Sequence, residues 1–465
     1  MRILLVLIFV GLGLFMQAQN TKEGAGTDQV HPRLQISNLK GGDFQPRAGG
    51  ICLDNKSQLY VCTWTTAGSI FKHSGKKGDT TAVRVAAGLA EPLGLQFYQG
   101  DLYVIQRQEL TRLRDLNNDG IFDLYETIYD DWAQSGNFHE LAFGLPMIGE
   151  HFFVGLSLAT KSSGELVNEL AEGRGQIMKI NNSGVAEVFA TGLNTPSGLS
   201  VAMDEQLLVT DQLGRSFRAA RLLLLGEGDD AGFHAGTLSP EAASPLLWIP
   251  RNDKFEKPGQ AILLQKGPYQ GQIVFGDVVG GGLARATIEE VNGQSQACLY
   301  NFSRGFDAGV FRIIEGADGQ IYIGGLDGTG NWGFPRSKRI ALHYVEWQEA
   351  NAFELSKVEA RQNGFILNFS EPFAEAIADT ALHLKLEQWH YQADGSISTV
   401  ETISVDSISF SDSRESIFIQ TDKMKSGHVV HIKLDDLLLS KAGNMILNPE
   451  AWYTLNQIPN KSGPN

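Results

Sequence analysis

The strongest chemical motif in the sequence is an acidic loop between residues 115 and 126. The loop satisfies the calcium-binding pattern D-x-[DN]-x-[DN]-G-x5-E, in which Gly120 permits the sharp turn. Ca²⁺ prefers about six to eight oxygen ligands. Those oxygens would come from alternate positions of the loop, namely Asp115, Asn117, Asp119, the carbonyl of Ile121, Asp123 and Glu126. We therefore predict a structural Ca²⁺ site, with an Asn/Asp-rich turn that binds no metal as the alternative.

Other motifs that carry chemistry are missing from the sequence. The glycine-rich stretch at 327–332 is not followed by the Lys-Ser/Thr of a phosphate loop, and no nucleophile elbow, H-E-x-x-H or zinc-binding cysteine spacing occurs. Three cysteines do not make a disulfide scaffold. Cys52 and Cys62 lie on the same face of two predicted strands, so they form either a cross-strand disulfide or two buried thiols, and Cys298 is left over.

The net charge and the first residues limit the possible partners and the compartment of the protein. A formal net charge of -15 without any basic run argues against nucleic acid as a partner. Arg2 and the apolar run at 3–16 predict a signal peptide over residues 1–20, cleaved near Ala18 to Asn20. The run is short for a membrane span, and no later stretch is apolar enough for one. We expect a periplasmic or secreted protein with no transmembrane segment after removal of the signal.

The elements that must position these groups are strands. A short apolar strand, a polar turn and a second apolar strand recur at 50–62, 93–105, 141–155, 197–210 and 311–324. All-β repeats spaced by roughly 45 residues predict the blades of a β-propeller, and we expect about six of them over residues 30–348. The apolar segment within 215–228 breaks the rhythm and fits either a short helix or a buried strand.

The pattern of apolar and polar residues changes after Trp347. Strand patterns at 365–369, 382–386, 417–419 and 429–434 alternate apolar with polar residues, which is typical of sheets with one solvated face. We predict an immunoglobulin-like β-sandwich over residues 350–458. The predicted fold class is therefore all-β, a six-bladed propeller followed by a small sandwich.

Several phrases together resemble a known family. The segment from Ser135 to Leu145, which carries His139, is similar to the His-bearing strand of the glucose/sorbosone dehydrogenase-like propellers, the soluble quinoproteins. A bacterial branch described as membrane-bound dehydrogenases, often linked to c-type cytochrome modules, shares further phrases. These lie at 62–64, 102–104, 106–113, 276–278, 281–283, 330–333 and 448–456. The resemblance covers nearly the whole mature chain.

The resemblance implies a site in the central depression at one face of the propeller. There a His takes the proton of an alcohol while hydride passes to pyrroloquinoline quinone, which Ca²⁺ and arginines hold in the family. His139 would be that base. Two departures stand out, because Phe138 replaces the Asp that precedes the catalytic His, and Asn194-Thr195 replaces an Arg-Asn pair. The second departure removes one expected cofactor contact.

Arginines near the ends of inner strands are the candidate clamp for the anionic cofactor. They are Arg107, Arg215, Arg285 and Arg304, and Gln106 could line the same depression. The alternative for the arginines is ion pairing between blades, and the alternative for His139 and Gln106 is a structural hydrogen bond.

Two functions follow from these features. The first is an exported oxidoreductase-like propeller that oxidises a sugar or another alcohol with a quinone, and passes electrons to a separate c-type cytochrome. The second is a non-catalytic propeller that binds carbohydrate or protein. A propeller hydrolase would need several inward acidic and amide residues around one metal, and the sequence shows no such set.

Overall fold

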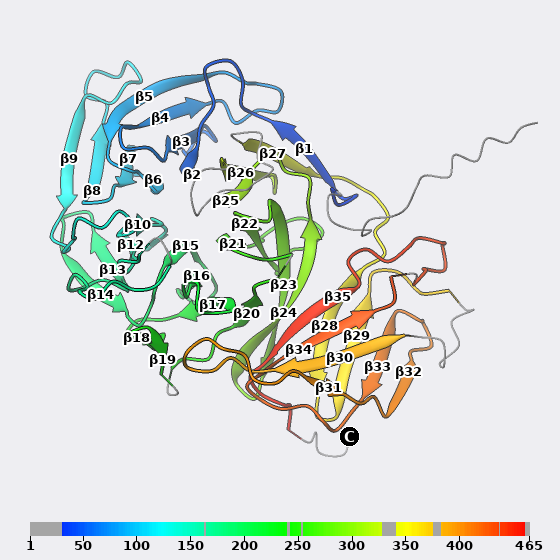
Figure 1. The fold of residues 1–465 in the computed structure, drawn as a ribbon. Helices are drawn as coiled ribbons and strands as arrows, with labels where there is room; N and C mark the ends of the chain where they lie inside the picture. The colour runs from blue at the N-terminus through cyan, green and yellow to red at the C-terminus, as the bar shows by residue number, and fades with distance from the viewer. Residues whose placement is uncertain are drawn as a thin grey trace, which may run out of the picture.

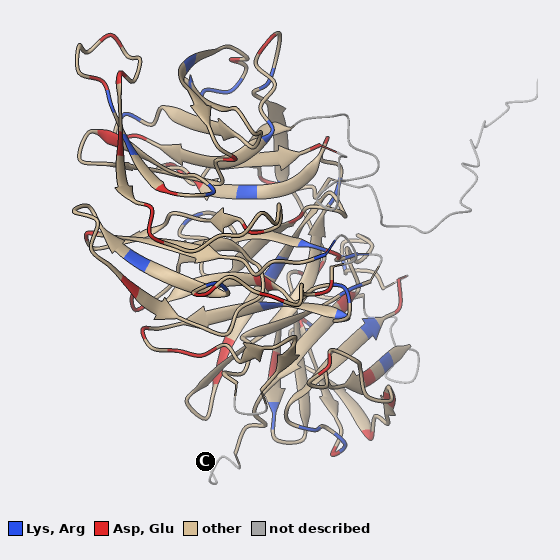
Figure 2. Ribbon diagram, turned by 60° about the vertical axis from the view of Figure 1, so that its left-hand side comes forward, with Lys and Arg blue, Asp and Glu red and all other residues tan. Residues whose placement is uncertain are grey.

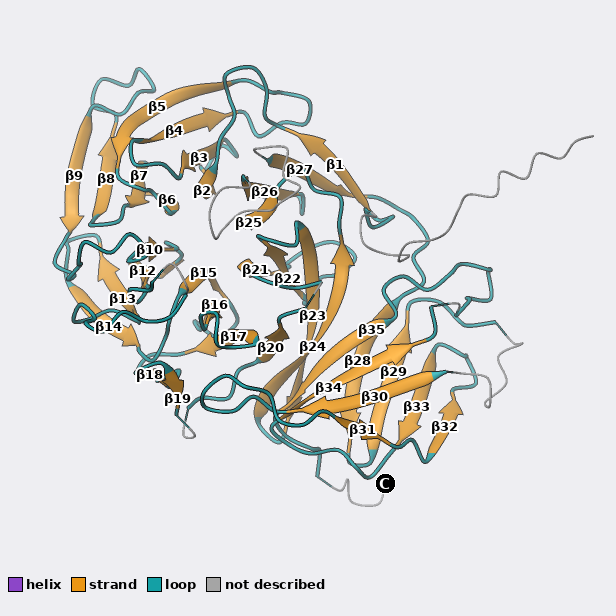
Figure 3. Ribbon diagram, viewed as in Figure 1, coloured by secondary structure: helices purple, strands orange, loops and turns teal. Residues whose placement is uncertain are grey.

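The computed structural model describes residues 30–460 except 162–163, 240–241, 253, 328–340, 375–382 and 437. The described residues form strands and no helix (Figure 3). No helix that could cross a membrane is therefore found in this part of the chain. The all-β fold class expected from the alternating apolar pattern is confirmed.

Six sheets stand around a central axis, which is the arrangement of a β-propeller (Figure 1). The first sheet consists of β2 (Ala48–Leu53), β3 (Leu59–Thr63), β4 (Gly68–His73) and β5 (Ala82–Leu89). The second consists of β6 (Gly94–Tyr98), β7 (Asp101–Ile105), β8 (Leu110–Arg114) and β9 (Leu124–Tyr129). The third consists of β10 (Ala142–Phe143), β12 (His151–Leu156), β13 (Gln176–Asn181) and β14 (Ala186–Ala190), with β11 (Met147–Ile148) beside β12.

The next three sheets continue the ring. The fourth sheet consists of β15 (Pro196–Val201), β16 (Leu207–Gln212), β17 (Ala219–Leu225) and β20 (Leu247–Pro250). The fifth contains β21 (Pro258–Leu263), β22 (Ile273–Asp277), β23 (Gly282–Val291) and β24 (Gln294–Ser303). The sixth consists of β25 (Gly309–Glu315), β26 (Ile321–Leu326), β27 (Leu342–Trp347) and β1 (Leu34–Asn38). The ring closes because β1, from the start of the chain, pairs with β27 (Figure 1). A small hairpin, β18 (Phe233–His234) and β19 (Thr237–Leu238), lies between β17 and β20.

The hairpins expected from the sequence are confirmed. Each predicted pair is antiparallel, as in β2 with β3, β6 with β7, β10 with β12, β15 with β16 and β25 with β26. The ambiguous segment at 215–228 contains strand β17 rather than a helix. Cys52 and Cys62 are buried free thiols, so the disulfide alternative is wrong.

Glycines let the inner strands approach one another at the axis. A Cβ on Gly94 would lie 1.4 Å from the carbonyl oxygen of Gly144 in the next sheet, and a Cβ on Gly50 would lie 2.8 Å from the Cα of Gly94. Only glycine fits such contacts. One buried apolar cluster takes residues from the strands or adjoining loops of all six sheets and so crosses the axis, including Trp64, Leu93, Phe143, Leu199, Val278 and Phe311.

The C-terminal strands form a two-layered sandwich with its own core. One layer is β28 (Leu355–Arg361), β29 (Gly364–Phe369), β33 (Ser416–Gln420) and β32 (Ser407–Phe410). The other is β35 (Glu450–Leu455), β34 (His428–Leu434), β30 (Leu384–Trp389) and β31 (Glu401–Ile403). Buried Phe365, Leu367, Ile419 and Val430 lie between them.

The sandwich shares a sheet with the propeller. Strand β35 pairs with β24, with Leu299 opposite Trp452, so a single eight-stranded sheet runs from β21 to β31 (Figure 1). The predicted limits at 348 and 350 fall between β27 and β28. The last strand nevertheless returns to the fifth sheet, and the two parts are hydrogen-bonded together.

Candidate functional site

The topology divides the propeller into two faces. Every sheet begins at the axis with a strand of the same direction, so all connections that lead into inner strands lie on one face. We call this the linker face; it carries residues 43–47, 90–93, 135–141, 191–195, 251–257 and 304–308. The opposite turn face carries the hairpin turns that follow the inner strands. His139 and the predicted arginines other than Arg285 lie in loops of the linker face.

His139 lies in a turn directly before β10, not on a strand as expected. Its ring is half-buried, and Nδ1 lies 2.8 Å from the carbonyl oxygen of Thr160. A carbonyl oxygen only accepts, so Nδ1 carries the proton, and Nε2 of the neutral ring keeps a lone pair. No hydrogen bond to Nε2 occurs among the described residues. The turn thus presents His139 as a base with a defined tautomer.

Neighbouring groups fix this turn. Asn137 accepts the backbone N–H of His139 at 2.8 Å and donates from Nδ2 to the Thr160 carbonyl at 3.1 Å. Arg174 donates to the carbonyl oxygens of Ser157 and Leu141 at 2.9 and 2.7 Å. Burial lowers the pKa of Arg174 to about 10, although the charge of Glu140 acts in the opposite direction.

The residues on either side of His139 differ in exposure, because Phe138 faces solvent and Glu140 is buried. Phe138 is 61% exposed, and its ring centroid lies 3.9 Å from that of His139. Glu140 is fully buried and accepts the backbone N–H of Ser135, while its Oε1 has no partner among the described residues. Phe138 therefore offers an apolar surface beside the candidate base.

Arg107 lies beside the His139 turn but is already engaged. One Nη donates to the carbonyl oxygen of Asn137, and the other lies 3.3 Å from Glu91. Gln106 is buried and donates to Glu109 at 2.9 Å and to Thr111 at 2.7 Å. The side-chain amide of Gln106 is thus engaged within its own hairpin.

A cationic group occupies the linker face between the fourth and fifth sheets. It consists of Arg215, Arg251 and Lys257, and Arg215 is exposed and adjoins Gly164 in the loop that also carries Thr160. Burial, and next the charge of Arg251, lower the pKa of Lys257 to about 8. Glu256 and Asp277 oppose this effect only in part. The sequence reasoning missed Arg251 and Lys257, although both lie in a connection that leads into an inner strand.

The other two predicted arginines, Arg304 and Arg285, bind groups of the protein itself. Arg304 is buried and donates to the carbonyl oxygens of Gly280 and Lys254. The Cα of Arg285 is on β23, the third strand of its sheet, and not on an inner strand. Its guanidinium lies 3.1 Å from Glu354 at the junction with the sandwich.

The predicted calcium loop joins β8 to β9 at the outer rim (Figure 1). Its acidic oxygens accept loop amides, since Asp115 bonds the N–H groups of Asp119 and Gly120, and Asp123 bonds that of Leu116. Glu126 lies 3.7 Å from Arg112. No group of three or more His, Cys, Asp or Glu suited to a metal occurs in the part of the chain that the structure describes. The loop, as it stands, lacks a complete ligand set.

Three further positions lie in segments that were compared with the family. Asn194, which with Thr195 stands where the resemblance predicts an Arg-Asn pair, is buried, and its backbone N–H lies 3.0 Å from Asp211. Trp64 belongs to the apolar core, and Trp332 lies outside the described residues. In the view of Figure 2, Lys and Arg lie interspersed with Asp and Glu along the ribbon.

Comparisons with known proteins support the fold. No family model and no curated protein matches the chain. A protein from Thermus thermophilus assigned as an oxidoreductase (glucose dehydrogenase) superposes with a TM-score of 0.54 at 16% identity, covering 67% of this chain and 99% of that chain. This likeness establishes the propeller fold.

Two further solved structures are similar at lower TM-scores. The holo form of the pyranose dehydrogenase PQQ domain from Coprinopsis cinerea matches with a TM-score of 0.49 at 10% identity, over 70% of this chain and 98% of that chain. The soluble aldose sugar dehydrogenase of Escherichia coli, in its apo form, matches with a TM-score of 0.45 at 11% identity, over 68% of this chain and 100% of that chain.

Proposed function

We propose that the protein is an exported oxidoreductase-like propeller that oxidises a sugar or another alcohol at its linker face. The carrying observation is the fixed tautomer of His139, whose Nδ1 is committed to the Thr160 carbonyl. Nε2 is then free to accept a hydroxyl proton, which is the step a general base performs in alcohol oxidation. Phe138 offers an exposed ring beside it, on which the apolar face of a sugar ring can lie.

The proton path uses residues of this chain alone. The substrate hydroxyl donates to Nε2 of His139, and the resulting imidazolium keeps its Nδ1–H on the Thr160 carbonyl. Asn137 holds the Thr160 carbonyl, and Arg174 holds the carbonyl oxygens of Ser157 and Leu141. These bonds keep the imidazole ring in place when it becomes charged. Removing a proton from oxygen prepares the neighbouring carbon to release hydride.

A hydride acceptor must complete the reaction. Pyrroloquinoline quinone would supply that chemistry when bound, and its carboxylates need cationic partners. Arg215, Arg251 and Lys257 fit this need, because they are three cationic groups on one face. Burial, and next the charge of Arg251, lower the pKa of Lys257, and a bound anion would favour its charged form. We propose that these three residues hold the quinone, and that a separate c-type cytochrome accepts its electrons.

The second candidate is a non-catalytic binding propeller. Exposed Phe138 at the position before the candidate base favours it, since an aromatic ring can hold a sugar without any chemistry. Under this reading the same face binds carbohydrate, and His139 acts as a hydrogen-bonding group.

Reconstitution separates the two candidates. Purified protein is mixed with pyrroloquinoline quinone and Ca²⁺, and bound quinone is followed by absorbance while aldoses are added with an artificial electron acceptor. Quinone binding with dye reduction supports the oxidoreductase. Sugar binding without quinone binding or dye reduction supports the binding protein.

A further inference from the structure

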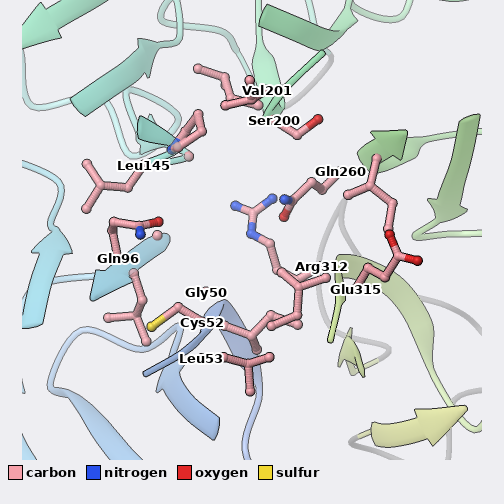
Figure 4. A pocket seen from close by; sticks show the side chains of 18 of the residues that line it. Gly50, Cys52, Leu53, Gln96, Leu145, Ser200, Val201, Gln260, Arg312 and Glu315 are labelled. Carbon is pink, nitrogen blue, oxygen red and sulfur yellow. The ribbon is translucent and has the colours of Figure 1, made fainter. Parts of the chain in front are cut away.

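The propeller holds a cavity at the face opposite His139. Its volume is about 600 Å³, and residues of the inner strands β2, β6, β15, β21 and β25 line it together with residues 144–146 (Figure 4). The apolar cluster that crosses the axis, with Trp64, Phe143 and Phe311, lies between this cavity and the linker face. The cavity is therefore a separate space, and a ligand bound in it would be independent of the proposed function.

Arg312 forms the closed end of the cavity. It is 2% exposed, and its guanidinium donates to carbonyl oxygens of three different sheets, those of Gly49 at 2.7 Å, Ser197 at 2.7 Å and Leu93 at 2.8 Å. A guanidinium has five N–H groups, so two are left after these three bonds. The ring of Phe311 covers one face of the guanidinium, with its centroid 3.7 Å from Cζ.

The charge of Arg312 has no anionic partner in the described part of the chain. Burial lowers its pKa to about 9, and the neighbouring Cys62 acts in the opposite direction. Buried charges in proteins are nearly always paired, because desolvation of a lone ion is costly. Neutral carbonyls satisfy the geometry of Arg312 but leave its charge uncompensated.

A second polar group reaches into the same space. Gln260 on β21 is half-buried and projects among the lining residues with Arg312 (Figure 4). No hydrogen bond to its side-chain amide occurs among the described residues. By contrast, the carboxylate of Glu315 at the mouth is taken up by the backbone N–H groups of Gln265 and Lys266, at 2.7 and 2.9 Å. The free donors thus lie at the closed end.

Several apolar side chains line the cavity between this end and the mouth, together with polar residues such as Gln96 and Ser200. The apolar side chains include Ile51, Leu95, Leu145, Val201, Ile262 and Ile314. A concave space of this size, with apolar side chains and a few convergent polar groups, is the usual form of a small-molecule site.

We infer that this cavity binds a small organic carboxylate with an apolar body, its carboxylate at Arg312 and Gln260 and its body along the apolar side chains of the wall. The carboxylate of the ligand acts as the counter-ion of Arg312. It also accepts a hydrogen bond from the side-chain amide of Gln260. This site is distinct in place and chemistry from the linker face.

Calorimetric titration of the full-length protein with hexanoate, compared with hexanamide, tests the inference. The two probes match in shape and differ in charge. We expect hexanoate to bind one site and to bind about tenfold or more tightly than hexanamide, since one charge-assisted contact is worth about 1.4 kcal/mol or more. Equal affinity of the two probes, or no binding of hexanoate, would overturn the inference.

Matched variants locate the site. Gln260→Glu places a like charge at the closed end and should weaken hexanoate binding at least about tenfold. Gln99→Glu makes the same charge change at an exposed turn of the same face, outside the cavity lining, and should leave binding unchanged. His139→Gln should also leave it unchanged. Equal loss in Gln99→Glu, or loss in His139→Gln, would contradict the assignment, and thermal melting of each variant confirms that it is folded.

Discussion

The Nδ1 atom of His139 lies 2.8 Å from the carbonyl oxygen of Thr160, across two loops of the same blade. This contact fixes the tautomer of the ring and leaves Nε2 as the basic nitrogen. Asn137 bonds both partners, so it acts on catalysis through His139 and is a positioning residue.

Asn137→Ala should therefore lower kcat by about tenfold with little change in KM, because a small misplacement of a base slows proton transfer more than binding. Steady-state kinetics with the reconstituted protein measure both constants. Asn182→Ala, which removes an amide from a surface turn of the next hairpin, should leave both constants unchanged. A purely structural role for Asn137 would instead lower the melting temperature and leave kcat per folded molecule intact.

The junction between propeller and sandwich should set the acid stability. Burial alone would raise the pKa of Glu354, but Arg285 and the hydrogen bonds of His31 and Tyr269 outweigh it and bring the pKa to about 2. A depressed carboxyl pKa stabilises the fold above the unfolded value of 4.5, and this stability is lost as pH falls from there toward 2.

Glu354→Gln should remove that pH dependence and cost about 3 kcal/mol at neutral pH, because it leaves Arg285 buried without its counter-ion. Denaturant unfolding from about pH 3 to about pH 7 measures the effect, since the carboxyl loses its stabilising charge toward the acid end of that range. Glu346→Gln, which breaks a surface pair with Lys77, should change stability by less than about 1 kcal/mol. Parallel pH profiles for Glu354→Gln and the wild type would refute the ionic account of the junction.

How far the sequence predicted this molecule depends on the range of the contacts. Hairpins such as β6 and β7 are local, so alternating residues and a turn predict them. The partner of Arg285 lies 69 residues away, and the pairing of β24 with β35 joins residues still further apart. Arg312 had a visible signal, a charge within the apolar run Phe311-Arg312-Ile313-Ile314, which in a propeller strand indicates a buried polar contact at the axis.

Binding of the quinone should depend on pH through Lys257. Its pKa is about 8, so its positive charge is present below that value and is lost as pH rises through it. Affinity for pyrroloquinoline quinone should therefore fall between about pH 7 and about pH 9, and Lys257→Met should bind weakly without this step. Lys161→Met, at an exposed position of a linker-face loop, is the matched control and should keep the step. A wild-type affinity that is flat across this range would rule out Lys257 as a carboxylate partner.

The acidic loop at 115–126 still predicts Ca²⁺ binding, although its oxygens accept loop amides in this structure. Ca²⁺ would have to draw Glu126 away from Arg112 and take over oxygens of Asp115 and Asp119. We expect Ca²⁺ to raise the melting temperature and a chelator to lower it, since a ligand of the folded state stabilises that state. Asp119→Ala should abolish the response without affecting the linker face. A melting curve that ignores both Ca²⁺ and chelator would show that amides alone hold the loop.

The central claim is that His139 is the base of an alcohol oxidation. The most direct measurement is the single-turnover rate of quinone reduction by an aldose, in the wild type and in His139→Gln, at equal quinone loading. The account predicts a rate reduced by about 10²–10⁴-fold in His139→Gln with quinone and sugar affinity within a few-fold of the wild type. An unchanged rate, or a variant that loses stability while its loaded fraction reacts normally, would contradict it.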